Sequence, residues 1–210
     1  MVGSKGAGQI WDFNNCVVIV AHPDDEILWA GGTILMHPDC KWTILSLCRG
    51  SDSDRAARFY KTLEYLHATG KMADVDDGPE QRPLTEREVQ NAILSLLALS
   101  KFDLILTHSL WGEYTRHIRH EETAKAVLAL RESGELTAKQ VWIFAYEDGG
   151  KRYLPRPVRD ADIVTRLPEE IWQKKYKIIT QIYGFEPESW EAKTTPREEA
   201  FWRLLPGKKK

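Results

Sequence analysis

The sequence has few cysteines, no large excess of charge of either sign and no long hydrophobic run. Its three cysteines, Cys16, Cys40 and Cys48, are too few and odd in number for a disulfide framework, so we expect reduced, buried thiols in a cytoplasmic protein. The net charge of −2 indicates neither a nucleic-acid partner nor a polybasic membrane patch. No apolar run approaches the roughly 18 residues of a membrane span, and we expect no signal peptide.

What is present is sufficient for one folded domain. The chain has 210 residues, of which 42% are hydrophobic, and this is typical of a globular protein with its own core. We expect a flexible N-terminus over residues 1–10 and a single domain over residues 11–210. We expect residues 151–210 to form a C-terminal extension packed on the core. Its aromatic side chains cover either the sheet edge or a second subunit of a homo-oligomer, and the sequence leaves both open.

Strands and helices are predicted to alternate along most of the chain. Residues 16–21 are apolar at every position, which is typical of a parallel strand covered on both faces. The pattern predicts an α/β protein with a Rossmann-like open, mostly parallel sheet, helices on both faces and a helical C-terminal extension. Further strands are predicted at 42–48, 103–108, 141–146 and 162–167, and helices at 27–36, 54–68, 85–99, 120–133, 168–183 and from Thr195–Pro196 onward.

Two loops hold most of the clustered histidine and carboxylate side chains. Ligands bind open α/β sheets outside the carboxyl ends of the strands, and the segment His22-Pro-Asp-Asp-Glu26 directly follows the first strand. Paired aspartates before a helix are often only a cap, but several ionisable groups at the end of a buried strand need a compensating positive charge. His117 and His120 open a later helix at positions i and i+3, so their rings face the same way.

Together these loops offer two imidazoles and one carboxylate to a single divalent metal. That set with a free position is found in catalytic zinc sites and in non-haem iron sites, so Zn²⁺ and Fe²⁺ both remain open. Asp24, beside the ligating Asp25, is left to act as a base on water. The alternative interpretation is two unrelated histidines held by ordinary hydrogen bonds.

The quoted residues resemble a known family. Ala21-His-Pro-Asp-Asp-Glu26 followed by Gly31-Gly32, together with Gly112-Glu-Tyr-x-x-His117-x-x-His120, is similar to the signatures of the PIG-L/LmbE-like metal-dependent N-acetylglucosaminyl de-N-acetylases. The resemblance spans most of the chain. It implies a zinc-dependent hydrolase that removes an acetyl group from the nitrogen of an N-acetylated amino sugar or a similar small polar amide.

Two alternatives to this function stay open. One is an amidase that uses the same metal site on a larger conjugate. The other is a non-catalytic Rossmann-like protein that binds a nucleotide or another small molecule. The turn after the first strand carries acids and no G-x-G-x-x-G fingerprint, which argues against a nucleotide-binding module.

The resemblance also implies a role for individual residues. It makes His22, Asp25 and His120 the zinc ligands. Asp24 is then the general base, and His117 stabilises the oxyanion. The resemblance also implies that Arg58 is an arginine that binds substrate and that Tyr114 is a tyrosine near the reacting carbonyl. The spacing that places Tyr114 is one residue longer than is usual in the family.

Position alone adds two further candidates for substrate contact. His108 directly follows a predicted strand, with a structural hydrogen bond as its alternative role. Trp111 lies in the same loop and is a candidate for stacking on a sugar ring, with packing as its alternative. Arg49 and Arg55 border the neighbouring loop, where arginine suits a polar or anionic substrate.

One departure from the family pattern concerns the late histidine pair. The family usually has Pro-Asp between these histidines, whereas this chain has Ile118-Arg119. A nearby arginine disfavours a second positive charge, so a protonated His117 is less well supported here. Glu113 and Glu121 are the carboxylates that could compensate.

Overall fold

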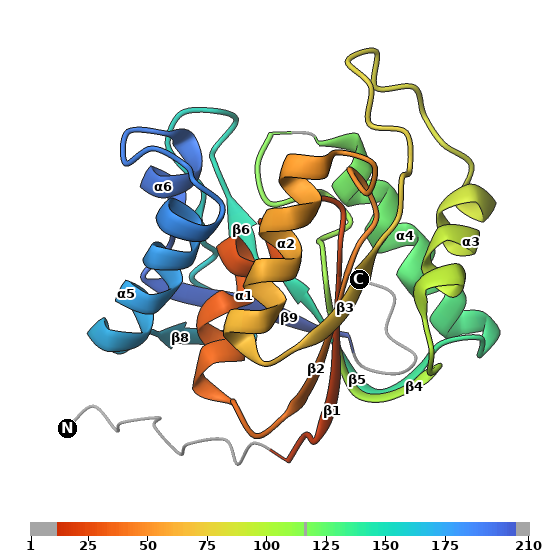
Figure 1. The fold of residues 1–210 in the computed structure, drawn as a ribbon. Helices are drawn as coiled ribbons and strands as arrows, with labels where there is room; N and C mark the ends of the chain where they lie inside the picture. The colour runs from red at the N-terminus through yellow and green to blue at the C-terminus, as the bar shows by residue number, and fades with distance from the viewer. Residues whose placement is uncertain (1–11, 116, 205–210) are drawn as a thin grey trace.

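The computed structural model describes residues 12–115 and 117–204 and shows the α/β fold expected from the sequence (Figure 1). The predicted flexible segment 1–10 lies outside the described residues. Among those described, no helix is both long and apolar enough to cross a membrane. The elements in chain order are β1 (Asn15–Val20), α1 (Asp25–Met36), β2 (Lys41–Ser46), α2 (Ser53–Leu66), β3 (Thr69–Met72), α3 (Glu86–Leu96), β4 (Lys101–Thr107), α4 (Ile118–Ser133), β5 (Thr137–Phe144), β6 (Tyr146–Glu147), β7 (Arg156–Pro157), β8 (Ile163–Arg166), α5 (Glu169–Lys177), the π-helix η1 (Ile178–Ile182), α6 (Trp190–Thr194) and β9 (Glu198–Leu204).

The main sheet has the order β3-β2-β1-β4-β5-β9-β8. Strands β1 to β5 are parallel, and β9 runs antiparallel to both β5 and β8. From β1 the chain builds outward to β3 and then returns to add β4 on the other side of β1. The strand order therefore reverses between β1 and β4, and their carboxyl ends are where such a sheet opens a binding crevice.

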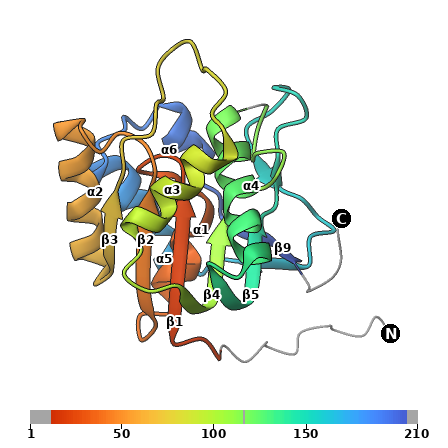
Figure 2. The same ribbon diagram turned by 90° about the vertical axis from the view of Figure 1, so that its right-hand side faces the viewer.

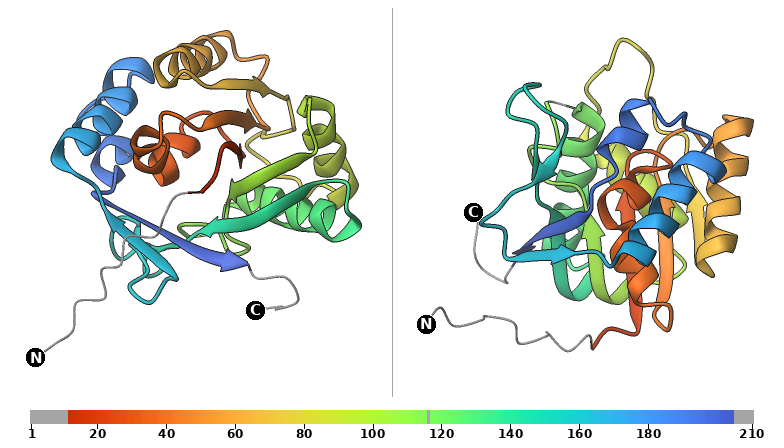
Figure 3. Two further views of the ribbon diagram at one scale, coloured as in Figure 1. Left: turned by 90° about the horizontal axis from the view of Figure 1, so that it is seen from below. Right: turned by 90° about the vertical axis from the view of Figure 1, so that its left-hand side faces the viewer.

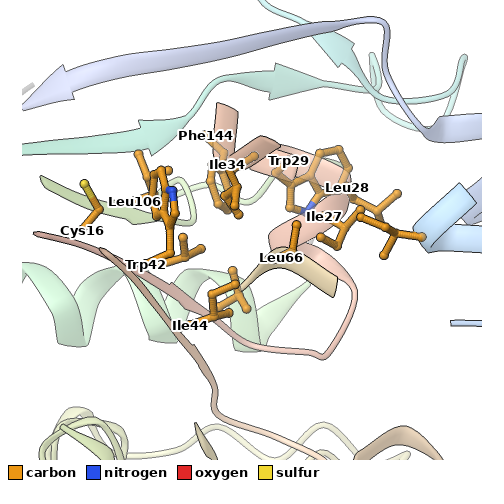
Figure 4. Close-up of a cluster of buried hydrophobic side chains, with 14 of the residues drawn as sticks. Cys16, Ile27, Leu28, Trp29, Ile34, Trp42, Ile44, Leu66, Leu106 and Phe144 are labelled. Atoms are coloured by element: carbon orange, nitrogen blue, oxygen red, sulfur yellow. The ribbon is translucent and has the colours of Figure 1, made fainter. Parts of the chain in front are cut away.

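Helices cover both faces of the sheet, and this explains why β1 is apolar at every position. Helices α1, α2 and α5 lie on one face, and α3 and α4 lie on the other (Figures 1, 2 and 3). Val18 and Val20 belong to the core cluster on the α1 side of the sheet. This cluster also includes Trp29 of α1 and Trp42 of β2 (Figure 4). Val17 packs in the opposite cluster, under α3 and α4. The three cysteines are free and buried, as expected.

The C-terminal segment is less helical than the sequence suggests, because it also supplies β8 and β9 to the main sheet. The prediction that Thr195 and Pro196 begin a helix is wrong. Thr195 instead ends α6, and the chain then continues as β9. The physical reason is long-range pairing with β5 and β8, which outweighs the local helix-start signal and is invisible to it.

The buried carboxylate of Glu199 on β9 binds to α1 through hydrogen bonds. Glu199 is fully buried, and its side chain accepts hydrogen bonds from the backbone N–H groups of Gly32 (2.6 Å) and Thr33 (2.7 Å) and from Nζ of Lys175 (2.7 Å). A Cβ at Gly32 would lie 2.4 Å from Leu167 and 3.0 Å from the Glu199 carboxylate. The glycine at position 32 is therefore explained by close packing of the C-terminal segment on α1.

Candidate metal centre

The first half of the site is the turn between β1 and α1. Asp24 precedes α1 with a φ of 121°, and its side chain makes no capping hydrogen bond. Its carboxylate lines a cavity, where Arg55 Nη1 lies 3.2 Å from Asp24 Oδ2. Asp25 is the first residue of α1. Its Oδ1 accepts a hydrogen bond from Trp29 Nε1 (3.0 Å), and its Oδ2 accepts one from the backbone N–H of His22 (3.0 Å). Asp25 is thus oriented by its own loop and helix, whereas the Asp24 carboxylate is contacted by Arg55 of α2.

The second half is the start of α4, which β4 delivers next to β1. His120 lies in the first turn of α4 and is fully buried. Its Nε2 lies 3.3 Å from Nδ1 of His22 and 3.2 Å from Oδ2 of Asp25. The remaining distance, between His22 Nδ1 and Asp25 Oδ2, is 3.2 Å. The structure therefore brings the three predicted ligand residues together.

The spacing of these three atoms suits a small divalent cation. In a tetrahedral zinc site with bonds of 2.0–2.1 Å, neighbouring ligand atoms are separated by about 3.3 Å. The observed triangle has sides of 3.2, 3.2 and 3.3 Å. The residues present therefore fit a metal ion with one coordination position left open toward the cavity.

Two other donor sets that share residues with this triangle, one with His108 and one with Cys48, are less suited to hold a metal ion. His108 Nε2 accepts the backbone N–H of Ala21 at 2.9 Å, so that lone pair is already engaged. Burial raises the pKa of the Cys48 thiol, which disfavours the thiolate that a metal requires. Besides the triangle, three further sets within the described residues bring ligand atoms close together, namely His22–His117–His120, which shares two residues with the triangle, His22–Cys48–Asp77 and Asp25–His108–His120.

Charge is distributed unevenly within the cluster. Burial opposes ionisation of both Asp25 and His120, but their mutual attraction is stronger. As a result the pKa of Asp25 lies well below its usual range, and that of His120 is raised to about 10. Without a metal, the site therefore holds an anionic carboxylate next to a protonated imidazole, and a bound cation would take the place of that proton.

Glu113 supports the cluster from behind. Its Oε2 lies 2.6 Å from His120 Nδ1 and 2.9 Å from His108 Nδ1. His108 is fully buried with both ring nitrogens engaged inside the protein, so the structure places it behind His120 and away from the cavity where a substrate contact was expected. A carboxylate on the outer nitrogen of a metal-binding histidine fixes its ring and tautomer.

Asp77 contacts the other histidine from the loop between β3 and α3. Its Oδ1 lies 3.4 Å from His22 Nε2, and its Oδ2 accepts a hydrogen bond from Arg49 Nη2 at 2.7 Å. The loop is anchored by Arg119, which is 2% exposed and donates to the carbonyls of Asp76 (2.5 Å) and Arg82 (2.8 Å). Arg119 is therefore directed away from the histidines and orders the loop that carries Asp77.

His117 completes the imidazole cluster. Its ring centroid lies 4.6 Å from that of His22 and 4.5 Å from that of His120. Burial, followed by the charges of these two histidines, lowers the pKa of His117 to about 4. His117 is therefore neutral at pH 7, and its neighbouring imidazoles, more than Arg119, disfavour the charged form. Its buried Nδ1 has no hydrogen-bond partner within the described residues.

A cavity of about 390 Å³ gives access to the cluster. Tyr114 lines it and contacts Trp190 with ring centroids 4.9 Å apart. Arg58 does not line it but bonds Asp54 at 2.8 Å, while Arg55, one helical turn earlier on α2, takes that place. Trp111 is 66% exposed and also lies outside the lining, so its packing role is not seen and its contact with a sugar ring stays a prediction.

Several cavity residues lie outside the two sequence motifs that hold the histidines. Trp190 and Glu191 come from α6, in the irregular C-terminal segment, and Asp77 comes from the loop before α3. A second cavity of about 430 Å³ adjoins this loop and shares Arg49, Asp52 and Asp77 with the first. Residues 74–77 include three aspartates, a pattern that is common in exposed turns.

Comparison with known proteins identifies the family. Residues 17–131, more than half of the chain, match the PIG-L family of GlcNAc-PI de-N-acetylases, and this range contains both halves of the site. The chain belongs to the PIG-L family. Family membership makes it a hydrolase of the de-N-acetylase type.

The individual proteins that this chain resembles are distant in sequence. An uncharacterized protein of Acanthamoeba polyphaga mimivirus is 21% identical over 179 residues, covering 78% of this chain and 76% of its own. The N,N′-diacetylchitobiose deacetylase of Pyrococcus horikoshii has a TM-score of 0.70 at 15% identity, covering 92% of this chain and 84% of that one. The 4-carboxy-2-hydroxymuconate hydratase of Pseudomonas putida has a TM-score of 0.62 at 16% identity, covering 94% of this chain and 98% of the hydratase chain. Because this fold also carries a hydratase, the shared architecture alone does not define the reaction.

Proposed function

We propose that this PIG-L protein is a zinc-dependent deacetylase that removes the acetyl group from an N-acetylated amino sugar or a similar small polar amide. The observation that carries the proposal is the triangle of His22 Nδ1, Asp25 Oδ2 and His120 Nε2, with the uncapped carboxylate of Asp24 beside it. These three residues would hold the metal. Zinc bound there would act as a Lewis acid and would bring the ionisation of water near neutral pH. Fe²⁺ suits the same donors, so both metals enter the test.

Asp24 is suited to move the proton. Burial raises its pKa well above the usual range, the charge of Asp25 raises it further, and Arg55 partly offsets both. A carboxyl group with a raised pKa can take a proton from water and return it to the departing amine. Arg55, 3.2 Å from Asp24, keeps that carboxylate directed into the cavity.

His117 and the cavity walls provide the remaining contacts. A neutral His117 still carries one ring N–H, and we propose that it donates this hydrogen to the oxygen on which negative charge develops. Arg55, Asp77 and Glu191 offer polar partners for hydroxyl groups, while Tyr114 and Trp190 form an aromatic wall. This combination supports a sugar as substrate, since sugar rings present both hydroxyl edges and apolar faces.

The test is release of free amine from N-acetylglucosamine derivatives and diacetylchitobiose by protein loaded with Zn²⁺ or Fe²⁺. In Asp24→Asn, which accommodates the positive φ better than alanine does, we expect the metal to be retained and turnover to fall by at least about 10²-fold. Undiminished turnover in this variant would remove Asp24 as the proton-transfer group. No hydrolysis by the metal-loaded native protein of any of these amides would overturn the proposed substrate class.

A further inference from the structure

The backbone of Asp24 is held in a conformation that non-glycine residues avoid. Its φ of 121° and ψ of −28° lie outside even the left-handed helical region. Such a residue costs free energy and persists only where its surroundings fix it, and it is commonly found at functional sites. The side chain of Asp24 points into the cavity because of this backbone geometry, so whatever fixes the backbone also aims the carboxylate.

One fully buried side chain bonds directly to this peptide. Glu26, in the first turn of α1, accepts the backbone N–H of Asp24 at 3.0 Å through Oε2. Its other oxygen, Oε1, accepts a hydrogen bond from the hydroxyl of Tyr183 at 2.5 Å. The Glu26 carboxylate does not line the cavity, which leaves it no direct contact with substrate.

Tyr183 reaches Glu26 from the C-terminal segment, 157 positions away in the chain. It directly follows the π-helix η1, is 3% exposed, and its carbonyl accepts a hydrogen bond from Arg58 Nη1 at 2.6 Å. π-helical turns of this kind often occur where a side chain must be placed for function. Three hydrogen bonds thus connect Arg58 of α2 to Tyr183, Tyr183 to Glu26, and Glu26 to the Asp24 peptide.

We propose that Glu26 and Tyr183 are positioning residues that hold Asp24 in its strained conformation for proton transfer. The inference rests on the proposed role of Asp24. It assigns Arg58, expected to contact substrate, to fixing the segment that carries Tyr183. The competing explanation is that Tyr183 merely fastens the C-terminal segment to α1.

The discriminating variant is Tyr183→Phe, with Tyr146→Phe as its matched control. Tyr146 is 5% exposed and donates its hydroxyl to the Trp29 carbonyl of the same helix at 3.2 Å, so both variants remove one buried hydroxyl from a contact with α1. We expect Tyr183→Phe to lower kcat by about 10- to 10²-fold, with KM and metal content unchanged. Tyr146→Phe should leave kcat within about twofold. Equal effects of the two substitutions would favour simple fastening and overturn the proposal.

A double variant separates positioning from general damage. If Tyr183 acts through Asp24, then Tyr183→Phe should cost almost nothing further in protein that already carries Asp24→Asn. The same fold loss in both backgrounds would contradict the proposal. Glu26→Gln keeps an acceptor for the Asp24 N–H and should retain more activity than Glu26→Leu.

Amide hydrogen exchange of Asp24, followed by NMR, decides the question without activity. The buried N–H should exchange slowly in the native protein and in Tyr146→Phe, and at least about tenfold faster in Tyr183→Phe. Unchanged exchange in Tyr183→Phe would overturn the inference whether or not the native protein hydrolyses amides. Absence of hydrolysis by the native protein would count only against the proposed function.

Discussion

Glu113 Oε2 lies 2.6 Å from Nδ1 of His120, on the side of the ring opposite the ligand triangle. The same oxygen lies 2.9 Å from His108 Nδ1. Burial raises the pKa of Glu113, but the charges and hydrogen bonds of these two histidines outweigh burial and lower it to about 2. One carboxylate therefore fixes the tautomer and orientation of two rings. Because outer partners of this kind tune metal affinity, Glu113 should matter nearly as much as a ligand.

We predict that Glu113→Gln weakens zinc binding by about 10- to 100-fold while the protein still folds. The measurement is competition for zinc with a chelating dye. Glu132→Gln, an exposed position on α4, the helix that carries His120, is the control and should bind zinc like the native protein. Native affinity in Glu113→Gln would show that the carboxylate does not support the metal site.

Zinc affinity should rise with pH. Because the pKa of His120 in the metal-free protein is about 10, the ring is protonated at neutral pH, and a metal must displace that proton. The pKa of His22 is also raised, so between pH 6.5 and 9 the affinity should increase by at least about tenfold per unit, with at least about one proton released per zinc. Calorimetric titration in buffers of different ionisation enthalpy measures that release. Heats that do not depend on the buffer would contradict the proton assignment.

Arg119 should control the order of the loop carrying Asp77. Arg119→Met removes the hydrogen bonds to the Asp76 and Arg82 carbonyls, so amide exchange across residues 73–84 should become faster. Zinc affinity should also fall, since Asp77 contacts His22. Arg131→Met, at the far end of α4, is the control. An unchanged exchange pattern would show that the loop is fixed by other contacts.

The buried pair of Glu199 and Lys175 should dominate attachment of the C-terminal segment. Glu199→Gln leaves the Lys175 charge without its partner at 2.7 Å and should lower the free energy of unfolding by about 3–5 kcal/mol. Glu198→Gln, on the same strand but half-buried and 3.7 Å from Arg166 in a solvent-accessible ion pair, should change it by less than about 1 kcal/mol. Urea unfolding measures both. Combining Glu199→Gln with Lys175→Met should recover part of the loss, and equal effects at positions 198 and 199 would contradict this account.

The central fold could be predicted because its signals are local or periodic. The uninterrupted apolar run that became β1 predicted a strand covered on both faces, and the alternation that followed predicted a parallel sheet. That sheet in turn predicted where His22 and His120 would meet. The tail could not be predicted in this way, since Thr195 and Pro196 carry a local helix-start pattern while β9 is defined by its pairing with β5.

Within the site, sequence motifs located the cluster better than its surroundings. His22, Asp25 and His120 stand in compact motifs, whereas Asp77 and Trp190 reach the cavity from segments without periodicity. Choosing between two arginines on one helix depends on how α2 packs against the C-terminal segment, and sequence spacing does not contain that information. For the same reason the link from Tyr183 to Glu26 becomes visible only in three dimensions.

The most direct test of the whole account is anomalous diffraction from zinc-loaded crystals. One peak is predicted per chain, within about 2.0–2.2 Å of His22 Nδ1, Asp25 Oδ2 and His120 Nε2. A peak bonded to a different set of side chains, or fully loaded crystals with no peak among these three residues, would contradict the central claim that they form one metal site.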